Sequence, residues 1–265
     1  MKIGLAGCAG RMGQMLIRQV IATSGCSLSY GLEPEASAHQ GRDLGDLVGL
    51  ERVGAVVISD PAKLCGASDV VIDFSSPHGT EALIAAARAH NCSLVIGTTG
   101  LGASQEQAIS DAVADISIVR SPNMSLGVNL LIGLVERVAG VLDIDYDIEI
   151  LEMHHRHKVD APSGTALALG RAAAVGRQAN LDEVSVRVRD GVTGPRKLGD
   201  IGFATLRGGD VIGDHVVTFA GEGERIELAH RAGNRQIYAR GAVRAAQWVK
   251  GRPPGAYGMR DVLGL

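Results

Sequence analysis

The densest concentration of residues able to do chemistry in this chain is the run EMHHRHKVDAPSGT, residues 152–165. Five consecutive side chains in it carry or can acquire positive charge: His154, His155, Arg156, His157 and Lys158. Histidine titrates near neutral pH and can transfer a proton, while lysine can stabilise negative charge that develops during a reaction. In a chain with a formal charge of -3, such a run predicts a site for a small polyanion such as a dicarboxylate.

The same run ends with a second anion-binding feature. Pro162 interrupts the chain and Ser163 is a preferred N-cap residue, so we expect a helix to begin directly after it. The backbone N–H groups near Gly164 and Thr165 would open that helix and point at an anion. This pattern predicts a binding site for a second carboxylate.

Two other interpretations of the basic run stay open at this point. The run could be a solvated basic loop, although three histidines in four positions are unusual for one. It could bind a metal, but adjacent histidines with no partnering cysteine or carboxylate motif give weak ligand geometry. Because the four cysteines form no C-x-x-C pair, we predict neither a zinc site nor a disulfide framework, and no metal cofactor.

A third candidate site lies near the start, where Gly7, Gly10 and Gly13 form G-x-x-G-x-x-G between a predicted strand and a predicted helix. Such a turn lets backbone N–H groups approach a pyrophosphate, and the helix N-terminus supplies positive dipole. Glu33 follows at the end of the second predicted strand, where an acidic side chain can bind ribose hydroxyls. A tight turn without a ligand and a solvated glutamate are the alternatives, but together the two features favour a dinucleotide. Small polar loops end two further strands, at residues 97–99 and 121–124.

Alternating strands and helices must position these residues over roughly the first 120 positions. We predict buried strands at residues 2–6, 27–32, 55–58, 70–74, 93–96 and 116–119, and helices at 11–23, 78–89 and 104–114. This alternation is typical of a doubly wound parallel sheet. The composition agrees, because 46% hydrophobic but only 3% aromatic residues suit aliphatic parallel strands covered by helices.

The second half of the chain lacks this regular alternation of strands and helices. We predict a long apolar helix at 126–142, a strand at 144–151 and a helix after Ser163. The apolar helix could belong to the core or to an interface, and we favour the core. Strands at 184–188, 202–206, 211–219 and 225–228 follow without crossover helices, and a last helix at 235–249 returns to the first domain. The predicted fold is therefore α/β: a Rossmann doubly wound parallel sheet, residues 1–125 and 235–265, plus an α+β substrate domain with a mixed sheet, residues 126–234.

The sequence disfavours three classes of protein: nucleic-acid-binding, secreted and membrane proteins. The slightly acidic balance argues against a general nucleic-acid surface, which needs excess positive charge. The start MKIGLAGCAGRMG is a poor signal peptide and no stretch approaches a bilayer span, so we expect a cytoplasmic protein with no membrane partner.

Several segments, in order and over essentially the whole chain, resemble those of the dihydrodipicolinate reductase (4-hydroxy-tetrahydrodipicolinate reductase) family. They are GCAGRMG, VIDFSSPHGT, VIGTTG, ILEMHHRHKVDAPSGTALALG, IGFATLRGGDVIGDHVVTFAGEGERIELAHRA and MRDVL, of which HHRHKVDAPSGTA is highly specific. The resemblance implies a Rossmann domain completed by the C-terminal helix, NADH or NADPH as cofactor, a small dicarboxylate as substrate and a homotetramer. It implies reduction of a cyclic imine, with loss of water from the hydroxylated substrate, giving tetrahydrodipicolinate for lysine and diaminopimelate.

The resemblance also implies roles for individual residues. The catalytic proton donor or acceptor falls on His154, and its partner proton donor falls on Lys158. Substrate contacts fall on His155, Gly164, Thr165 and Thr99. Cofactor contacts fall on Gly7, Cys8, Ala9, Gly10, Arg11, Met12, Glu33, Gly97, Thr98, Thr99, Ser121, Pro122, Asn123 and Met124.

One departure from the family bears on the cofactor. Family members that use NADPH well often carry arginine directly after the acidic residue of the second strand, where it can pair with the 2′-phosphate. This chain has Pro34 there. We therefore predict a preference for NADH, with Arg11 as an alternative partner of the phosphate. Two rival functions stay open: another two-domain dehydrogenase, which leaves the basic run unexplained, and a catalytically silent NAD-binding sensor.

Overall fold

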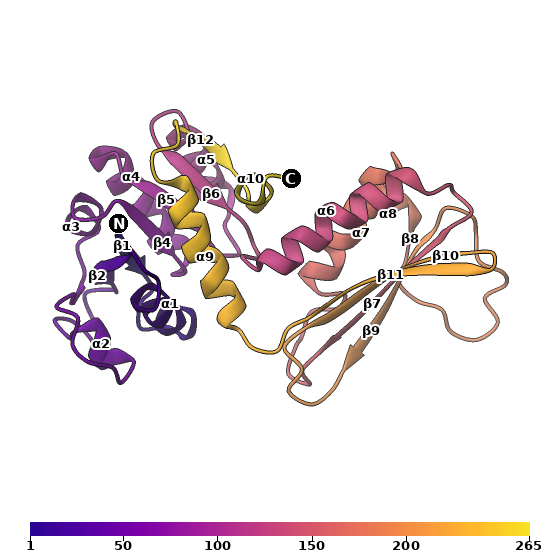
Figure 1. The fold of residues 1–265 in the computed structure, drawn as a ribbon, viewed down its shortest axis with the longest axis horizontal. Helices are drawn as coiled ribbons and strands as arrows, with labels where there is room; N and C mark the ends of the chain where they lie inside the picture. Colours follow the sequence, from indigo (N-terminus) through magenta and orange to yellow (C-terminus); the bar gives the residue numbers. More distant parts are fainter. The chain divides into compact units, whose positions relative to one another are not determined.

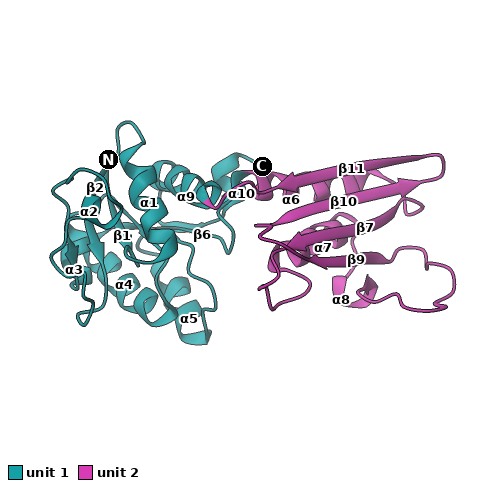
Figure 2. Ribbon diagram, turned by 90° about the horizontal axis from the view of Figure 1, so that it is seen from below, with its two compact units in different colours: residues 1–126, 236–265 teal, residues 127–235 magenta.

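The computed structural model describes all residues from Met1 to Leu265. The chain forms two compact units (Figure 2). Unit 1 comprises Met1–Leu126 together with Gln236–Leu265, and unit 2 comprises Gly127–Arg235. The chain therefore leaves unit 1 once and returns to it with the C-terminal helices.

Unit 1 is built on a seven-stranded, wholly parallel sheet in the order β3-β2-β1-β4-β5-β6-β12 (Figure 1). The strands are β1 (Lys2–Ala6), β2 (Ser27–Leu32), β3 (Val57–Ile58), β4 (Val70–Asp73), β5 (Ser93–Ile96), β6 (Ser117–Arg120) and β12 (Gly255–Tyr257). The helices are α1 (Arg11–Ile21), α2 (Leu44–Leu47), α3 (Pro61–Gly66), α4 (Pro77–His90), α5 (Ala103–Ala112), α9 (Gln236–Val249) and α10 (Met259–Leu263). Because β4 returns to pair with β1 on the side opposite β2, the strand order reverses between β1 and β4, where open α/β sheets bind ligands.

Helices cover both faces of this sheet. Val70 and Ile72 of β4 pack in one core cluster with α1 and α9, whereas the intervening Val71 packs in another with residues of α3, α4 and α5. Side chains alternate between the two faces of a strand, so a strand covered on both sides must be apolar throughout. Helix α9 returns to α1, where the Gln236 side chain donates to the Met15 carbonyl at 3.4 Å.

Unit 2 contains a five-stranded sheet in the order β11-β10-β7-β9-β8. Its strands are β7 (Asp147–His154), β8 (Ser185–Val186), β9 (Ile201–Arg207), β10 (Asp214–Gly221) and β11 (Glu224–Arg231), and its helices are α6 (Leu126–Val141), α7 (Gly164–Gly176) and α8 (Leu181–Val184). Strand β10 is antiparallel to both neighbours, while β7, β9 and β8 are parallel. The predicted fold class, a Rossmann sheet plus a mixed sheet, is confirmed.

One face of the mixed sheet packs against α6 and α7 (Figure 1). Ile148 and Ile150 of β7 and Phe219 of β10 are buried there. The prediction that the long helix at 126–142 belongs to the core holds for one side of α6 only, because Leu130 and Leu134 are each 43% exposed. No helix in the structure has the length and apolar character needed to cross a membrane.

Several element predictions were wrong. Five short elements were not predicted from the sequence, each of six residues or fewer: α2, α3, α8, α10 and β12. For α3 the signals were present, since Asp60 accepts from the N–H groups of Ala62 and Lys63 and Pro61 occupies the first helical position. The apolar run at 55–58 yields only a two-residue strand, because Val56 faces Asp43 in an isolated bridge.

Candidate active site

Strand β7 brings the first residues of the basic run into the covered face of the mixed sheet. We predicted its end at residue 151, but it continues to His154. The buried positions alternate as Ile148, Ile150, Glu152 and His154, so the last two carry on the inward pattern with polar side chains. Apolar periodicity cannot reveal such a continuation, which requires polar partners in the interior.

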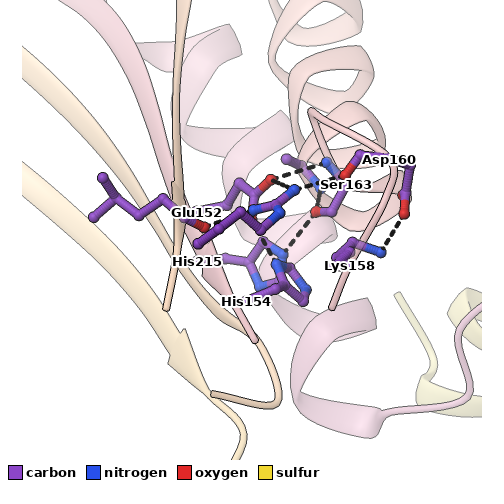
Figure 3. Close-up of polar contacts among 9 residues, drawn as sticks. Glu152, His154, Lys158, Asp160, Ser163 and His215 are labelled. Atoms are coloured by element: carbon purple, nitrogen blue, oxygen red, sulfur yellow. Dashed lines mark hydrogen bonds and ion pairs between the residues drawn. The ribbon is translucent and has the colours of Figure 1, made fainter. Parts of the chain in front are cut away.

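Those partners converge on the carboxylate of Glu152, which is 1% exposed (Figure 3). Its Oε2 lies 2.5 Å from His154 Nδ1. The Arg207 guanidinium, at the end of β9, donates to both carboxylate oxygens at 2.9 Å. The backbone N–H of Ser163 donates to Oε1 at 3.1 Å. Glu152 thus joins β7, β9 and the N-cap of α7.

These hydrogen bonds fix the charge of Glu152 and the tautomer of His154. Burial would raise the pKa of Glu152, but the hydrogen bonds from Arg207, His154 and Ser163 outweigh it and hold the pKa below its usual range. An ionised carboxylate only accepts hydrogen bonds, so His154 Nδ1 must carry the hydrogen. The nitrogen left to exchange a proton is therefore Nε2.

Gly213, before β10, lies beside Nε2 of His154. A Cβ built on Gly213 would lie 2.9 Å from that nitrogen, so a larger residue would crowd it. The ring of His215 packs edge-on against His154 with centroids 5.1 Å apart, and its Nε2 lies 3.2 Å from Ser163 Oγ. Burial and the neighbouring His154 lower the pKa of His215 to about 4, so His215 is neutral at neutral pH.

Lys158 lies in the loop that follows β7. Its Nζ is 2.8 Å from Asp160 Oδ1, and its side chain is 22% exposed (Figure 3). Arg207 also donates to the carbonyl oxygen of Asp160 at 2.6 Å, so the loop is tied to the same guanidinium that holds Glu152. His155 is half-buried, and desolvation together with nearby cations, Arg235 first, lowers its pKa. Arg156 and His157 are exposed.

The N-terminus of α7 has the form that the sequence predicted. Ser163 is the N-cap and its Oγ accepts from Ala166 N–H at 3.2 Å. Gly164 is exposed, and a Cβ built on it would meet no atom within 4 Å. Internal crowding therefore does not require glycine at this position, which leaves room above the first N–H groups of the helix. The structure has no group of three or more His, Cys, Asp or Glu residues arranged to hold a metal ion.

In unit 1 the predicted cofactor residues lie along one edge of the parallel sheet. Leu32, Ala6, Asp73, Ile96 and Arg120 are consecutive register partners across β2, β1, β4, β5 and β6. The residues that follow them open the loops carrying Glu33, Gly7–Met12, Gly97–Thr99 and Ser121–Met124. All four predicted segments therefore emerge at the carboxyl ends of neighbouring strands.

The glycine turn at this edge has no room for side chains. Gly7 has φ +77°, and a Cβ on it would lie 2.4 Å from the Phe74 carbonyl oxygen. A Cβ on Gly13 would lie 2.2 Å from the carbonyl oxygen of Gly7. Helix α1 begins at Arg11 with Gly10 as N-cap and has no side-chain cap, so no cap side chain covers its first N–H groups. This combination fits the close approach of a pyrophosphate.

Glu33 and Cys8 play different parts beside that turn. The Glu33 carboxylate accepts from Ala9 N–H at 2.6 Å, which ties the end of β2 to the glycine turn. The Cys8 side chain is fully buried against Gly31 and Leu44, and burial together with Glu33 raises its pKa to about 12. Only the backbone of Cys8 is therefore placed to meet a ligand.

A buried carboxylate supports two more of the loops. Asp73, at the end of β4, is 0% exposed and accepts from the N–H and hydroxyl of Ser75 and from the hydroxyl of Thr80. Thr98 Oγ1 in turn accepts from Ser75 N–H at 3.1 Å. Thr99 is exposed. In the next loop the Ser121 hydroxyl donates to the Asn123 carbonyl at 2.8 Å.

The sequence did not reveal Arg207, His215 or Asp73, and it gave Glu152 no role although this residue begins the run 152–165. All four are buried or half-buried polar residues. Glu152 and Arg207 are 55 residues apart and Ser163 and His215 are 52 apart, whereas Asp73 is held by the nearby Ser75 and Thr80. The one available signal was the position of Glu152, two residues before His154 and directly after the strand predicted at 144–151. Nothing local marks Arg207 or His215.

Comparison with protein-family models matches residues 1–124 to "Dihydrodipicolinate reductase, N-terminus" and residues 127–263 to "Dihydrodipicolinate reductase, C-terminus". The chain is 54% identical over 265 residues to the 4-hydroxy-tetrahydrodipicolinate reductase of Parvibaculum lavamentivorans, covering 100% of this chain and 98% of that protein. It is 53% identical to the enzyme of that name from Rhizobium rhizogenes, covering 100% and 97%.

Among solved structures, the chain is similar to a dipicolinate-bound dihydrodipicolinate reductase from Paenisporosarcina sp. TG-14, with a TM-score of 0.78 and 98% of each chain covered. At 23% identity this likeness concerns the fold alone. The family models, by contrast, match nearly every residue of both units in order. The chain belongs to the dihydrodipicolinate reductase family.

Proposed function

We propose that this chain uses NADH or NADPH to reduce (2S,4S)-4-hydroxy-2,3,4,5-tetrahydrodipicolinate to (S)-2,3,4,5-tetrahydrodipicolinate and water, in the diaminopimelate route of lysine biosynthesis. The observation that carries this proposal is the family match over both units, with full-length relatives above 50% identity that bear the reductase name. We place the reaction in the cytoplasm, where the pools of reduced nicotinamide cofactor are found. We propose His154 and Lys158 as the acid–base groups, as the family resemblance implies.

Unit 1 is proposed to bind the cofactor, whose chemistry is the donation of a hydride. The crowding around Gly7 and Gly13 and the uncapped start of α1 support a pyrophosphate site in the segment Gly7, Cys8, Ala9, Gly10, Arg11, Met12. Glu33 would accept hydrogen bonds from the adenosine ribose. Gly97–Thr99 and Ser121–Met124, at the ends of β5 and β6, would line the remainder of the cofactor.

Unit 2 is proposed to bind the dicarboxylate and supply the proton. The N–H groups of Gly164 and Thr165 would hold one carboxylate at the start of α7, and His155 would contact the substrate beside them. His154, with Nδ1–H fixed on Glu152, would transfer the proton through Nε2. Lys158 would donate a hydrogen bond to negative charge on the substrate as it develops, and Thr99 is assigned as a further substrate contact.

We propose a preference for NADH, which the end of β2 supports. Pro34 offers no cation, and the Gln40 side-chain amide donates to the carbonyl oxygens of Glu33 and Pro34 at 3.1 and 2.9 Å. A 2′-phosphate would lie near the Glu33 carboxylate with no guanidinium directly after it, so Coulomb repulsion disfavours NADPH. Arg11 is exposed at the start of α1 and is the competing candidate for that phosphate.

We further propose that unit 2 assembles the protein into a homotetramer through the face of the mixed sheet that no helix of the unit covers (Figure 2). By register, Leu151 of β7 lies beside Ala204 of β9 and Val216 of β10, and Val216 lies beside Ala229 of β11. Leu151 is 41% exposed and Leu206, two residues along the same face, is 48% exposed. An apolar strip across an open sheet is suited to association with a second sheet.

The decisive assay follows the fall in absorbance of NADH, and separately of NADPH, with substrate generated in place from pyruvate and aspartate semialdehyde by the preceding synthase. Oxidation that requires every component is the expected result, faster with NADH at equal concentration. A folded protein that binds NADH but oxidises neither cofactor would contradict the proposal and favour a silent sensor.

Sedimentation of the wild type and of Leu151→Glu would test the tetramer, which the charged variant should weaken.

A further inference from the structure

Glu152 accepts four hydrogen bonds within one covered face of the mixed sheet: one from His154, two from Arg207 and one from Ser163 N–H. A carboxylate removed from water requires strong compensation, which the bidentate guanidinium supplies. Each donor leads to a part of the proposed active site. His154 is the proton-transfer residue, Ser163 caps the helix of the anion site, and Arg207 reaches the carbonyl of Asp160 in the loop of Lys158.

We infer that Glu152 and Arg207 are a positioning pair: Glu152 holds the ring of His154 so that Nε2 exchanges the proton, and Arg207 ties that carboxylate to the loop carrying Lys158. The inference rests on the proposed function for the identity of the reaction. It concerns residues that need not touch the substrate, since they act through His154 and Lys158. Glu152 contacts His154 directly, and Arg207 contacts the backbone of Asp160, whose carboxylate pairs with Lys158.

The geometry makes the role specific. Because Glu152 Oε2 is 2.5 Å from Nδ1, rotation of the His154 ring would break a charge-assisted hydrogen bond in the interior. The other charged or titratable groups around His154 are Arg207 on β9, His215 on β10, and His155 and Lys158 on the chain that follows β7. Among these, Glu152 is the carboxylate that contacts the ring, and Arg207 is the cation that neutralises it.

Opposite electrostatic effects are therefore expected from the two members of the pair. Removing the negative charge with Glu152→Gln disfavours the imidazolium form of His154. Removing the cation with Arg207→Gln leaves the Glu152 charge less compensated and so favours that form. A merely structural pair would give changes of the same kind for both variants, namely loss of thermal stability without opposite movements.

The test is a nitrogen-15 NMR titration of the histidine side chains in the full-length protein without ligands, with the His154 signals identified by their loss in His154→Asn. The wild type should show the Nδ1–H tautomer. Glu152→Gln should mix the tautomers and titrate at lower pH, whereas Arg207→Gln should titrate at higher pH. The control is Glu149→Gln, which removes a carboxylate with the same bidentate arginine contact from the opposite face of β7 and should leave His154 unchanged.

Steady-state kinetics complete the experiment. Both variants should lower kcat about 10- to 100-fold, the effect seen when the hydrogen-bond partner that orients a metal-binding histidine is removed. The affinity for NADH should not change. In the pH profile of kcat, the limb that belongs to His154 should move to lower pH in Glu152→Gln and to higher pH in Arg207→Gln, as in the NMR titrations. Unchanged tautomer and midpoint in both folded variants would overturn the inference, as would movement in one common direction. If Glu152→Gln does not fold, the upward movement in Arg207→Gln decides it. A wild type without turnover would overturn the reaction but not the NMR result.

Discussion

The N-termini of α1 and α7 both present backbone N–H groups where we propose that anions bind, but they are built in different ways. At α1 the glycines are imposed by crowding, since a Cβ on Gly13 would lie 2.2 Å from the Gly7 carbonyl oxygen. At α7 a Cβ on Gly164 would meet no atom within 4 Å. The residues around this helix start are held by the ion pair and hydrogen bonds of Glu152. The first site depends on the shape of the backbone, and the second depends on a buried network around Glu152.

The largest effect is expected from the loop tied to that network. Lys158→Ala removes the hydrogen-bond donor proposed to stabilise developing negative charge, so kcat should fall about 1,000-fold, within the range for such groups. Fluorescence titration with NADH should give a near-normal Kd, because unit 1 is untouched. Lys197→Ala, which removes an exposed cation from the same unit, is the control. Unchanged turnover in Lys158→Ala would remove this residue from the mechanism.

A smaller but broader effect is expected at α1. Gly13→Ala must displace the backbone of residues 7–8, at a cost of about 1–3 kcal/mol for overpacking, and should weaken NADH binding at least about tenfold. Thermal unfolding and NADH titration measure the two effects separately. Gly66→Ala is the matched control, because its new methyl group meets only the movable His90 ring, at 3.2 Å. Normal NADH affinity in a stable Gly13→Ala protein would contradict the shape argument.

Gly164→Ala should reverse that pattern. The added methyl group has open space around it, so the unfolding temperature should stay the same, while a substrate carboxylate at the start of α7 would meet it directly. We expect KM for the dicarboxylate to rise about tenfold, corresponding to about 1.4 kcal/mol, with NADH affinity unchanged. Gly233→Ala, equally open and in the same unit, should leave KM alone. A loss of stability equal to that of Gly13→Ala would erase the contrast between the two sites.

The smallest effect is expected for the choice of cofactor. The wild type should have a higher kcat/KM with NADH than with NADPH, because no cation follows Glu33. Pro34→Arg supplies a guanidinium and should raise kcat/KM for NADPH several-fold, with little change for NADH. Arg11→Ala distinguishes the alternative, since NADPH use would drop in that variant if Arg11 binds the phosphate. A wild type that favours NADPH would contradict the argument from Pro34.

The same contrast explains what the sequence could predict. In unit 1, the spacing of Gly7, Gly10 and Gly13 predicts a tight turn. The alternation of apolar strands with helices predicts a parallel sheet. Both signals are local, so the fold class and the position of the glycine turn follow from the sequence. Short elements such as β12 lack enough residues to show periodicity, and their pairing depends on β6, more than 130 residues earlier.

In unit 2 the sequence reveals the reactive groups but not their support. His154 and Lys158 stand out as a basic run, and Ser163 is visible as an N-cap. The pairing of Glu152 with Arg207 becomes visible only when β7 and β9 are aligned, because His154 and Arg207 are register partners on those strands. The predicted end of β7 was three residues short for the same reason: the polar side chains that extend the strand are stabilised by residues far along the chain.

We propose that this chain delivers a hydride to the cyclic dicarboxylate. The most direct measurement is to supply nicotinamide cofactor carrying deuterium at its transferable position, with substrate made in place by the synthase, and to analyse the product by mass spectrometry. We expect tetrahydrodipicolinate that carries one deuterium, formed as fast as the cofactor is consumed. Cofactor oxidation with no deuterium in that product, or no oxidation by folded wild-type protein, would contradict it.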